Sequence, residues 1–295
     1  MNSPRIIFMG TPEFAVASLD ALVKKGFNII AVVTAPDKPA GRGMKPSQSA
    51  VKKYAQENGL RLLQPEKLKD PLFLEELRSL RADLQIVVAF RMLPEIVWNM
   101  PAMGTINLHG SLLPQYRGAA PINWTIINGE KETGVTTFKL RQEIDTGDIL
   151  MQESFPIGED ETAGEVHDRM MHIGADLLVR TVSGITEGAL VPLPQDKLVG
   201  SQHHPGLEIK HAPKINTETC RINWSQTADK IHDQVRGLSP FPGAFTIMNE
   251  KMLKIYRTKK EIIFPAHTEG DLVTDGKTFL KFTDRKSTRL NSSHA

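Results

Sequence analysis

The stretch Ile6-Ile7-Phe8-Met9-Gly10-Thr11-Pro12-Glu13 opens the chain with a pattern that decides the fold class. Its continuous apolar run is typical of a strand buried on both faces of a parallel sheet. The turn that follows predicts a helix whose first residue is Pro12, with Thr11 as its N-cap and Gly26 at its end. A second apolar run over 29–34 completes a strand–helix–strand unit. Because the turn lacks the repeated glycines of a dinucleotide-binding fingerprint, no dinucleotide cofactor is predicted.

The same alternation of strand and helix continues through the first part of the chain. Apolar runs and helical spacing predict strands over 60–63, 84–90 and 105–108 and helices over 49–58, 71–80 and 93–98. Strands that alternate with helices are typical of an α/β fold with a Rossmann-like, doubly wound, mostly parallel sheet. Ligands of such sheets bind beyond the carboxyl ends of the strands, so a site is expected directly after 105–108.

The remainder of the chain has a different pattern. Apolar spacings of three and four predict a helix over 163–183, which Gly184 ends, and 190–207 is rich in Pro, Gln and His and is predicted as a linker. Further on, we expect a helix over 228–237 and short strands over 243–248, 251–258 and 278–282. Several short strands separated by Gly and Asp turns indicate a small barrel or sandwich.

The last eleven residues, 285–295, do not continue this pattern. They are polar, lack periodicity and resemble sequence appended to a natural chain, so we leave them out of the fold prediction. A genuine disordered tail is the alternative. If the natural residues stop near Thr283, the small barrel lacks its closing strands and is truncated, with an exposed edge.

Composition narrows the class of protein. The chain has 295 residues, of which 40% are hydrophobic and 24% charged, which is typical of a globular protein and long enough for two domains. Its apolar runs are too short for a membrane helix, so no membrane partner is expected. The single cysteine, Cys220, excludes an internal disulfide and favours the reducing cytoplasm. Residues 201–295 carry more Lys and Arg than Asp and Glu, which hints at a polyanionic partner.

Two segments carry polar residues suited to acyl transfer. Asn107 and His109 lie two apart at a predicted strand end and therefore project to the same side. An imidazole can take a proton from an amine, and a carboxamide can donate to a developing oxyanion. Asp145, in an Asp-Thr-Gly-Asp turn, could orient that imidazole. Taken alone, the histidine could be structural and the turn could be no more than a turn, and the spacing does not decide.

The resemblance of these two segments to a known family favours the catalytic interpretation. The signature of the folate-dependent formyltransferases resembles two segments here, Asn107-Leu108-His109-Gly110-Ser111-Leu112-Leu113-Pro114 with Tyr116-Arg117-Gly118, and Asp145-Thr146-Gly147-Asp148. The segments 8–15 and 238–244 are similar to the branch of the family that acts on methionyl-tRNA, and the likeness runs from Arg5 to Phe282. It implies an enzyme that carries the formyl group of 10-formyltetrahydrofolate to methionyl-initiator tRNA for translation initiation. The family's catalytic Asn, His and Asp correspond to Asn107, His109 and Asp145.

The resemblance also implies a domain arrangement. A Rossmann-like catalytic domain would cover 1–189, a linker 190–207 and a small OB-like β-barrel 208–284, with 285–295 as a non-native tail. The enzyme would be a cytoplasmic monomer. Its chemistry needs no metal, because the formyl group on folate is already activated. The only His and Cys cluster, at His203, His204, His211 and Cys220, lacks zinc-finger spacing.

The folate donor is expected along three segments of the family's site. They correspond to Ser111, Leu112, Leu113, Pro114, Tyr116 and Gly118, to Val88, Ala89, Phe90 and Arg91, and to the loop over 145–148. Phe90-Arg91 departs from the Tyr-Gly that is more frequent there. Arg91 either meets the anionic glutamyl tail of folate or is a solvated charge, and the sequence leaves both open.

The tRNA acceptor is expected at the loop over 35–47. Its cations outnumber its acids, and Pro and Gly between them suit a mobile loop that settles on phosphates. The ordinary alternative is a solvated surface loop. The resemblance favours tRNA contact by Lys38, Arg42 and Lys45, with Arg42 as the main one.

Two rival functions remain at this point. One is the same chemistry on an amino-sugar nucleotide or a glycinamide nucleotide. The other is a catalytically idle module that only binds tRNA or folate. The loop around Arg42 argues against the first rival, and an intact Asn107, His109 and Asp145 set argues against the second.

Overall fold

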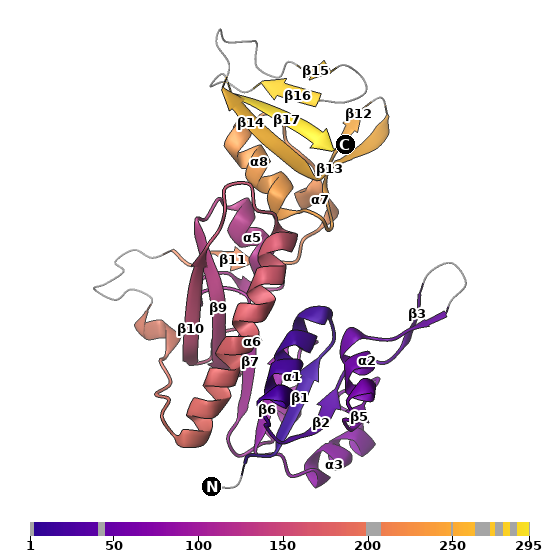
Figure 1. Cartoon of the computed structure of the whole chain (residues 1–295), viewed down its shortest axis with the longest axis vertical. Coiled ribbons are helices and arrows are strands. Elements are labelled where there is room, and N and C mark those ends of the chain that lie inside the picture. Colours follow the sequence, from indigo (N-terminus) through magenta and orange to yellow (C-terminus); the bar gives the residue numbers. More distant parts are fainter. Residues whose placement is uncertain are drawn as a thin grey trace. The chain divides into compact units, whose positions relative to one another are not determined.

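The computed structural model describes residues 3–40, 45–198, 208–248, 250–262, 272–274, 280–283 and 288–294, and for 38–40, 45–46 and those beyond 260 it describes the backbone alone. The chain passes back and forth between two units. Unit 1 consists of Met1–Pro114, Gly134–Glu153 and Arg169–Glu208. Unit 2 consists of Gln115–Thr133, Ser154–Asp168 and Ile209–Ala295. Figure 1 labels most of the elements of both units.

A seven-stranded sheet forms the framework of unit 1. Its order is β10-β9-β7-β6-β1-β2-β5. The strands, in chain order, are β1 (Ile6–Gly10), β2 (Ile29–Val33), β5 (Leu62–Leu63), β6 (Leu84–Val88), β7 (Thr105–His109), β9 (Glu132–Lys139) and β10 (Ile149–Pro156). The five from β5 to β7 are parallel, and β9 runs antiparallel to β7. The predicted mostly parallel, doubly wound sheet is confirmed.

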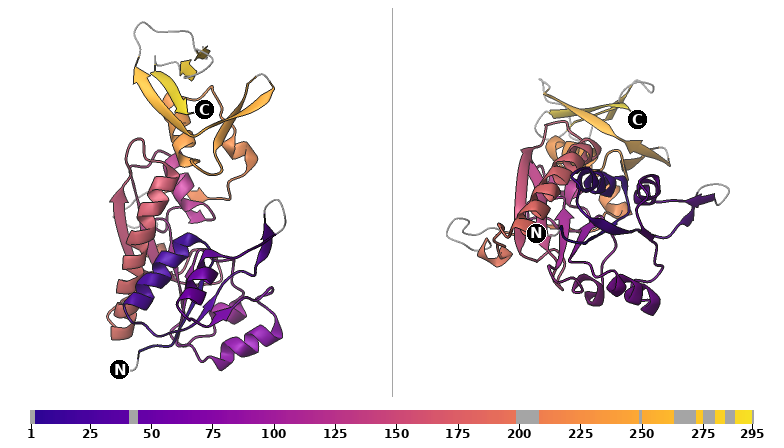
Figure 2. Two further views of the ribbon diagram at one scale, coloured as in Figure 1. Left: turned by 45° about the vertical axis from the view of Figure 1, so that its right-hand side comes forward. Right: turned by 60° about the horizontal axis from the view of Figure 1, so that its bottom comes forward.

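Helices cover both faces of this sheet. Because they do, every residue of the central strand β1 is buried. On one face, Ile7 and Met9 join a core with Phe73 and Leu77 of α3 (Pro71–Ser79) and with Val97 of α4 (Glu95–Trp98). On the other lie α1 (Glu13–Lys24) and α2 (Ala50–Glu57), and Figure 2 shows them across the sheet from α3. The apolar strands of the sequence predict this arrangement, since a parallel sheet that is buried on both faces has helices packed on each face.

Two helix ends differ from the prediction. Helix α1 begins at Glu13, its N-cap is Pro12, and that cap makes no side-chain hydrogen bond, so Thr11 is not the cap. Helix α6 (Ala163–Glu187) continues through Gly184. A Cβ at Gly184 would lie 2.8 Å from Cγ of Leu190, so this glycine makes room for a neighbour instead of ending the helix. The helix ends before Gly188, whose φ is +68°.

Unit 2 contains elements that the sequence pattern did not predict. The strands β8 (Arg117–Gly118) and β11 (His211–Ala212) pair in parallel, and α5 (Pro121–Ile127) lies in a stretch for which no helix was predicted. Helix α5 packs on α8 (Ala228–Gly237), where Asn123 Nδ2 donates to the Gly237 carbonyl at 2.7 Å. The predicted helix over 228–237 is confirmed residue for residue.

The core of unit 2 lies under α8. Its apolar face, with Ile231 and Val235, meets a hairpin of β12 (Ala244–Met248) and β13 (Lys251–Ile255). The short helix α7 (Thr217–Cys220) adds Cys220, whose thiol donates to the Asn216 carbonyl at 3.2 Å. Burial raises the pKa of that thiol, as expected for a packed cysteine.

A second sheet of unit 2 includes part of the segment left out of the prediction. Its order is β14-β17-β16-β15, with β14 (Arg257–Ile262), β15 (Leu272–Thr274), β16 (Leu280–Thr283) and β17 (Thr288–His294) all paired antiparallel. The backbone of 288–294 therefore supplies a strand between β14 and β16. That 285–295 is a non-native tail stays a prediction. The strand expected over 251–258 is divided between β13 and β14 at Tyr256.

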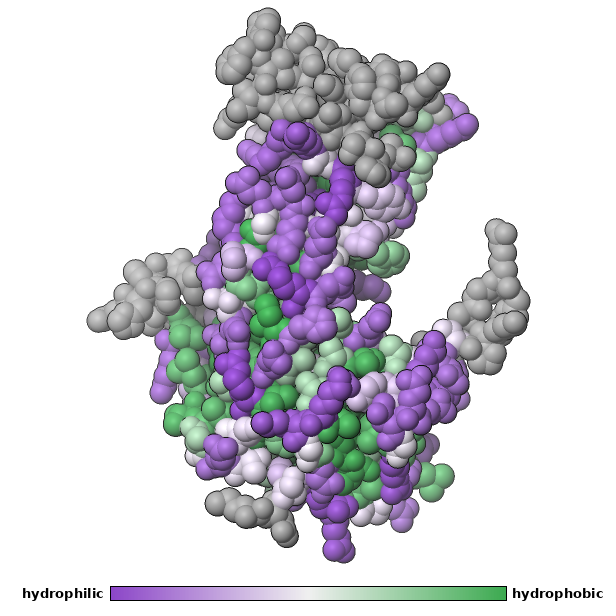
Figure 3. Space-filling model, viewed as in Figure 1, coloured by the Kyte–Doolittle hydropathy of each residue, from purple (hydrophilic) through white to green (hydrophobic). Residues whose placement is uncertain are grey.

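The linker and the surface complete the description. Of the predicted linker 190–207, residues 190–198 include the short 3₁₀ helix η1 (Gln195–Lys197), and 199–207 lie outside the described residues. On the face drawn in Figure 3, hydrophilic and hydrophobic residues are interspersed. Within the described part of the chain, each helix is too short or too polar to span a bilayer.

Candidate active site

The carboxyl end of β7 carries two of the predicted catalytic residues. Asn107 lies beside Val87 of β6 on one side and Phe138 of β9 on the other, which fixes its place in the middle of the sheet. His109 ends the strand two residues later and is 7% exposed, and its ring lies in a T-shaped arrangement with the ring of Phe138, with 6.4 Å between the two centroids. Both side chains project to one side because strand residues alternate. The sheet thus presents an amide and an imidazole at one rim.

The loop that carries Asp145 is folded tightly against β9. Asp145 adopts a φ of +54°, and the Lys139 backbone N–H donates to the Asp148 carbonyl at 2.9 Å. Gly147 has no room for a side chain, since a Cβ there would lie 1.6 Å from the Lys139 carbonyl oxygen. The Asp148 carboxylate accepts two hydrogen bonds from Arg141, at 2.8 and 2.9 Å. Of the two aspartates in this turn, Asp148 is therefore bound to Arg141.

Asp145 reaches the imidazole. Its Oδ2 lies 3.8 Å from Nδ1 of His109, and the two side chains are only 12% and 7% exposed. This is an ion-pair distance, longer than a hydrogen bond. A carboxylate this close can fix the orientation of the imidazole. Residues 36 positions apart in the sequence thus meet at the sheet rim, on the side of β7 that also carries Asn107.

Two residues that sequence reasoning missed support the segment after His109. Thr136 on β9 is fully buried, and its Oγ1 donates to the Ser111 carbonyl at 2.7 Å and accepts from the Leu113 N–H at 3.1 Å. Gln152 on β10 donates to the Leu113 carbonyl at 2.9 Å. Neither strand was predicted, so the pattern gave no signal for these contacts. Together they fix the backbone where folate contact is expected.

A third missed residue, Gln195, lies in the predicted linker. Its side chain is 2% exposed, and Nε2 donates to the carbonyls of Asp145 and Gly147 at 2.9 and 2.8 Å. A polar residue in a Pro- and Gln-rich stretch is ordinarily exposed, so the sequence carried no signal that this one is buried against the site.

Of the predicted folate residues, Val88 ends β6, the neighbour of β7, and Ala89, Phe90 and Arg91 follow it. Ala89 turns the chain with a φ of +45°. The Arg91 guanidinium donates to the carbonyls of Pro65 and, at 2.8 Å, Glu66, and it lies over the Phe90 ring at 5.6 Å. Burial lowers its pKa. Arg91 is thus not a freely solvated charge: it ties the turn after β6 to the loop after β5.

Ser111, Leu112, Leu113 and Pro114 belong to unit 1, whereas Tyr116 and Gly118 belong to unit 2. Tyr116 is 4% exposed, and its hydroxyl donates to Glu130 at 2.5 Å, a carboxylate that also accepts from Lys210. Burial, together with that carboxylate, raises the pKa of Tyr116. Gly118, with a φ of +128°, lies so close to Ala212 that a Cβ would come within 2.4 Å of its carbonyl oxygen. Both residues therefore have packing roles within unit 2.

The predicted tRNA-binding residues are only partly described. Lys38 and Lys45 lie in two short strands, β3 (Lys38–Ala40) and β4 (Lys45–Ser47), which pair antiparallel. The stretch expected as a loop thus contains a short hairpin. Arg42 lies outside the described residues.

No group of three or more His, Cys, Asp or Glu side chains in the described part of the chain gathers in a way that could hold a metal ion. His203 and His204 lie outside that part. The expectation that the chemistry needs no metal stays a prediction.

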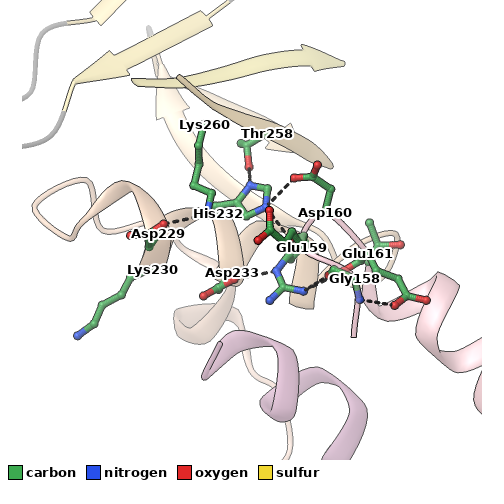
Figure 4. Close-up of polar contacts among 12 residues, drawn as sticks. Gly158, Glu159, Asp160, Glu161, Asp229, Lys230, His232, Asp233, Thr258 and Lys260 are labelled. Atoms are coloured by element: carbon green, nitrogen blue, oxygen red, sulfur yellow. Dashed lines mark hydrogen bonds and ion pairs between the residues drawn. The ribbon is translucent and has the colours of Figure 1, made fainter. Parts of the chain in front are cut away.

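A second buried histidine lies in unit 2, on α8. His232 is 2% exposed, with Nδ1 2.8 Å from Thr258 Oγ1 and Nε2 3.2 Å from both the Glu159 carbonyl and Asp160 Oδ1 (Figure 4). Since those two oxygens only accept, Nε2 carries the proton, and in the neutral ring Thr258 donates to Nδ1. Burial lowers the pKa of His232.

The fold is similar to that of solved formyltransferases. An N-formyltransferase from Helicobacter canadensis, solved in complex with folinic acid and dTDP-3-aminofucose, superposes with a TM-score of 0.74 at 21% identity over 98% of this chain and 99% of its own. At that identity the likeness concerns the fold alone.

Sequence comparison is more specific. Residues 4–182 match the formyl transferase family and residues 214–285 its C-terminal domain. A methionyl-tRNA formyltransferase of Bacteroides fragilis is 51% identical over 94% of this chain and 86% of its own length. One of Porphyromonas gingivalis is 51% identical over 98% and 90%. The chain belongs to the formyl transferase family, and within it to the methionyl-tRNA formyltransferases.

Proposed function

We propose that the rim of the unit 1 sheet transfers the formyl group of 10-formyltetrahydrofolate to the amino group of methionyl-initiator tRNA, and so supplies formylated initiator tRNA for translation. The observation that carries this proposal is the His109–Asp145 pair, 3.8 Å apart at the carboxyl end of β7. Its support from outside the site is the 51% identity to methionyl-tRNA formyltransferases over nearly the whole chain.

The three residues divide the reaction between them. The amine of the methionyl group attacks the formyl carbon, and a tetrahedral oxyanion forms. Asn107 donates a hydrogen bond to that oxyanion and stabilises it, and His109 adds to this stabilisation once it has taken the proton that the amine loses. His109 takes the proton that the amine loses and returns it to the folate nitrogen as the carbon–nitrogen bond of the donor breaks. Asp145 keeps the imidazole oriented and stabilises its charged form.

The donor would lie along two segments whose backbone is held by side-chain hydrogen bonds. Ser111 to Pro114 are fixed by Thr136 and Gln152, and Val88 to Arg91 are fixed by the contacts of Arg91 with the loop after β5. Because the guanidinium of Arg91 already donates to two carbonyls, we assign it to shaping this wall. Tyr116 and Gly118 complete the set that the family resemblance proposes.

The acceptor tRNA would be held by cations. We assign Lys38, Arg42 and Lys45 to the acceptor end and the basic C-terminal part of unit 2 to other phosphates. In this proposal the strands from β12 to β17 belong to a small OB-like β-barrel, and 1–189, 190–207 and 208–284 are catalytic domain, linker and barrel. The enzyme would work as a cytoplasmic monomer without a metal.

A formylation assay tests the proposal. The protein is incubated with 10-formyltetrahydrofolate and charged initiator tRNA, beside uncharged tRNA and an amino-sugar nucleotide as alternative acceptors. Formyl-methionine on tRNA alone is the expected product. Asn107→Ala should lose about 10²–10³-fold in rate, the usual effect of removing one oxyanion donor. A near wild-type rate for Asn107→Ala would contradict the site.

The tRNA assignment is tested in the same assay with Arg42→Ala. Loss of one phosphate contact should raise the KM for tRNA and weaken its dependence on salt, while the KM for folate stays unchanged. Equal losses for both substrates would contradict a role in tRNA binding.

A further inference from the structure

Gln195 connects the predicted linker to the proposed site. It is the first residue of η1 and is 2% exposed, although its neighbours Asp196 and Lys197 are both exposed. A side-chain amide has two N–H donors, and those of Gln195 go to the carbonyls of Asp145 and Gly147, at 2.9 and 2.8 Å. The amide thus holds the Asp145 loop at two points.

The two carbonyls lie on either side of a constrained turn. Asp145 has a φ of +54°, in the left-handed region that residues with a side chain adopt only rarely. Such a conformation persists only where its surroundings enforce it. Because the carbonyl that Gln195 binds belongs to Asp145 itself, this contact also sets the direction in which the Asp145 carboxylate approaches His109.

Gln195 is itself held in place from both sides. On the N-terminal side, Leu193 and Ile149 exchange two backbone hydrogen bonds, each 2.8 Å long. On the C-terminal side, Leu198 packs against the buried cluster of Leu113, Phe138 and Ile149. Phe138 is the residue whose ring meets His109. Leu198, which helps to hold Gln195, and Phe138, whose ring lies beside His109, therefore pack in the same hydrophobic cluster.

We propose that Gln195 is a positioning residue for formyl transfer, acting on the reaction through Asp145. The inference rests on the proposed function, because it takes Asp145 as the residue that orients His109. Without the amide, the loop loses both hydrogen bonds and leaves two carbonyls unsatisfied, so the carboxylate drifts from its 3.8 Å approach to Nδ1. The effect falls mainly on the rate of the chemical step.

The first test replaces Gln195 by Met, which keeps the length of the side chain and removes both donors. Single-turnover formylation should slow about 10–100-fold, the range seen when a residue that orients a functional group is lost. The KM for tRNA should stay within about threefold, because the residues assigned to tRNA lie outside the Asp145 loop. Since the loop over 145–148 is also among the expected folate contacts, the KM for folate should rise by less than the rate falls.

The matched control is Gln234→Met. Gln234 is a glutamine of unit 2 whose Nε2 also donates to two backbone carbonyls, those of Thr219 and Arg221 at 2.8 and 3.1 Å. It should lower thermal stability with a turnover rate within about twofold of wild type. Equal loss of turnover in both variants, or a loss in Gln195→Met that appears only as raised KM, would overturn the proposal.

A double-mutant cycle separates this inference from the proposed function. If Gln195 acts only through Asp145, adding Gln195→Met to Asp145→Asn should cause no further loss of rate, whereas independent effects would multiply. A multiplied loss overturns the role of Gln195. If Asp145→Asn alone keeps the wild-type rate, the proposed site itself fails. Gln195→Asn, too short to reach both carbonyls, replaces the Met variant if that one does not fold.

Discussion

Unit 1 and unit 2 each bury a histidine beside an aspartate, and the two imidazoles are held in different ways. His109 is 7% exposed with its carboxylate at 3.8 Å, and His232 is 2% exposed with Asp160 at 3.2 Å. By burial and by acidic neighbour alone, His232 would be the better candidate for catalysis. Its ring, however, lies on the inner face of a helix, with Thr258 at one nitrogen and a backbone carbonyl at the other (Figure 4).

For a catalytic role, the position of a histidine in the fold is therefore more informative than how deeply its side chain is buried. His109 ends a central parallel strand, where sheets of this type bind ligands. His232 links α8 to the loop around Asp160 and to β14, and so joins three elements of unit 2. We therefore interpret the first as a working group and the second as a structural one.

The largest expected effect separates the two histidines by rate. His109→Ala should lower turnover by about 10²–10⁴-fold, the contribution typical of a general acid–base group, with little change in melting temperature. His232→Ala should keep turnover within about twofold and destabilise unit 2 by about 1–3 kcal/mol, because Thr258 and the Glu159 carbonyl lose a buried partner. Steady-state rates and thermal melts of both variants test this prediction. It would be wrong if His232→Ala lost turnover and His109→Ala lost mainly stability.

A smaller effect concerns the pH dependence of stability. Burial lowers the pKa of His232, and the nearby charges of Lys260 and Arg236 lower it further, against the opposing effects of the Glu159 carbonyl and Asp160. The unfolded chain therefore binds a proton that the folded chain resists, so stability is complete above about pH 6.5 and falls as the pH drops below it. His232→Gln should flatten this part of the curve. Melts between pH 5 and 8 measure it, and an unchanged slope in the variant would contradict the structural assignment.

The smallest expected effect concerns the same dependence of stability on pH, through Lys260. Lys260 forms a surface ion pair with Asp229 at 2.9 Å, which by itself should contribute no more than about 1 kcal/mol. Lys260→Met removes one of the charges that oppose protonation of His232. The pKa of His232 in the folded protein should then rise, and the loss of stability in acid should become slightly smaller. A steeper loss in the variant would show that another group controls the acid limb.

Much of the fold could be predicted because local patterns and tertiary packing agree there. The run Ile6 to Met9 is apolar throughout and forms a strand buried on both faces, and helix 228–237 matches its prediction. Strand β9 was missed because Thr133, Gly134, Thr136 and Thr137 interrupt its apolar pattern, although all four are buried in the fold. Gly184 misled the prediction of a helix end because its packing against Leu190 is tertiary.

For the site, the sequence pointed to the right residue types, but only the fold brings them together. The spacing of Asn107 and His109 follows from strand geometry, whereas nothing in the pattern places Asp145 within 4 Å of His109. Gln195 shows the limit most clearly. Its neighbours in the sequence indicate a linker, and its role depends on a carbonyl 50 residues earlier in the chain.

The interleaving of the two units has a consequence for synthesis on the ribosome. Helix α5 emerges early, but its packing partner α8 is more than a hundred residues further along, as the Asn123–Gly237 contact shows. The nascent chain must therefore carry α5 with its apolar side uncovered until most of the protein has been translated. A fragment that stops before 228 would keep the residues of the proposed catalytic rim but leave the apolar side of α5 exposed. Such a fragment is therefore expected to aggregate.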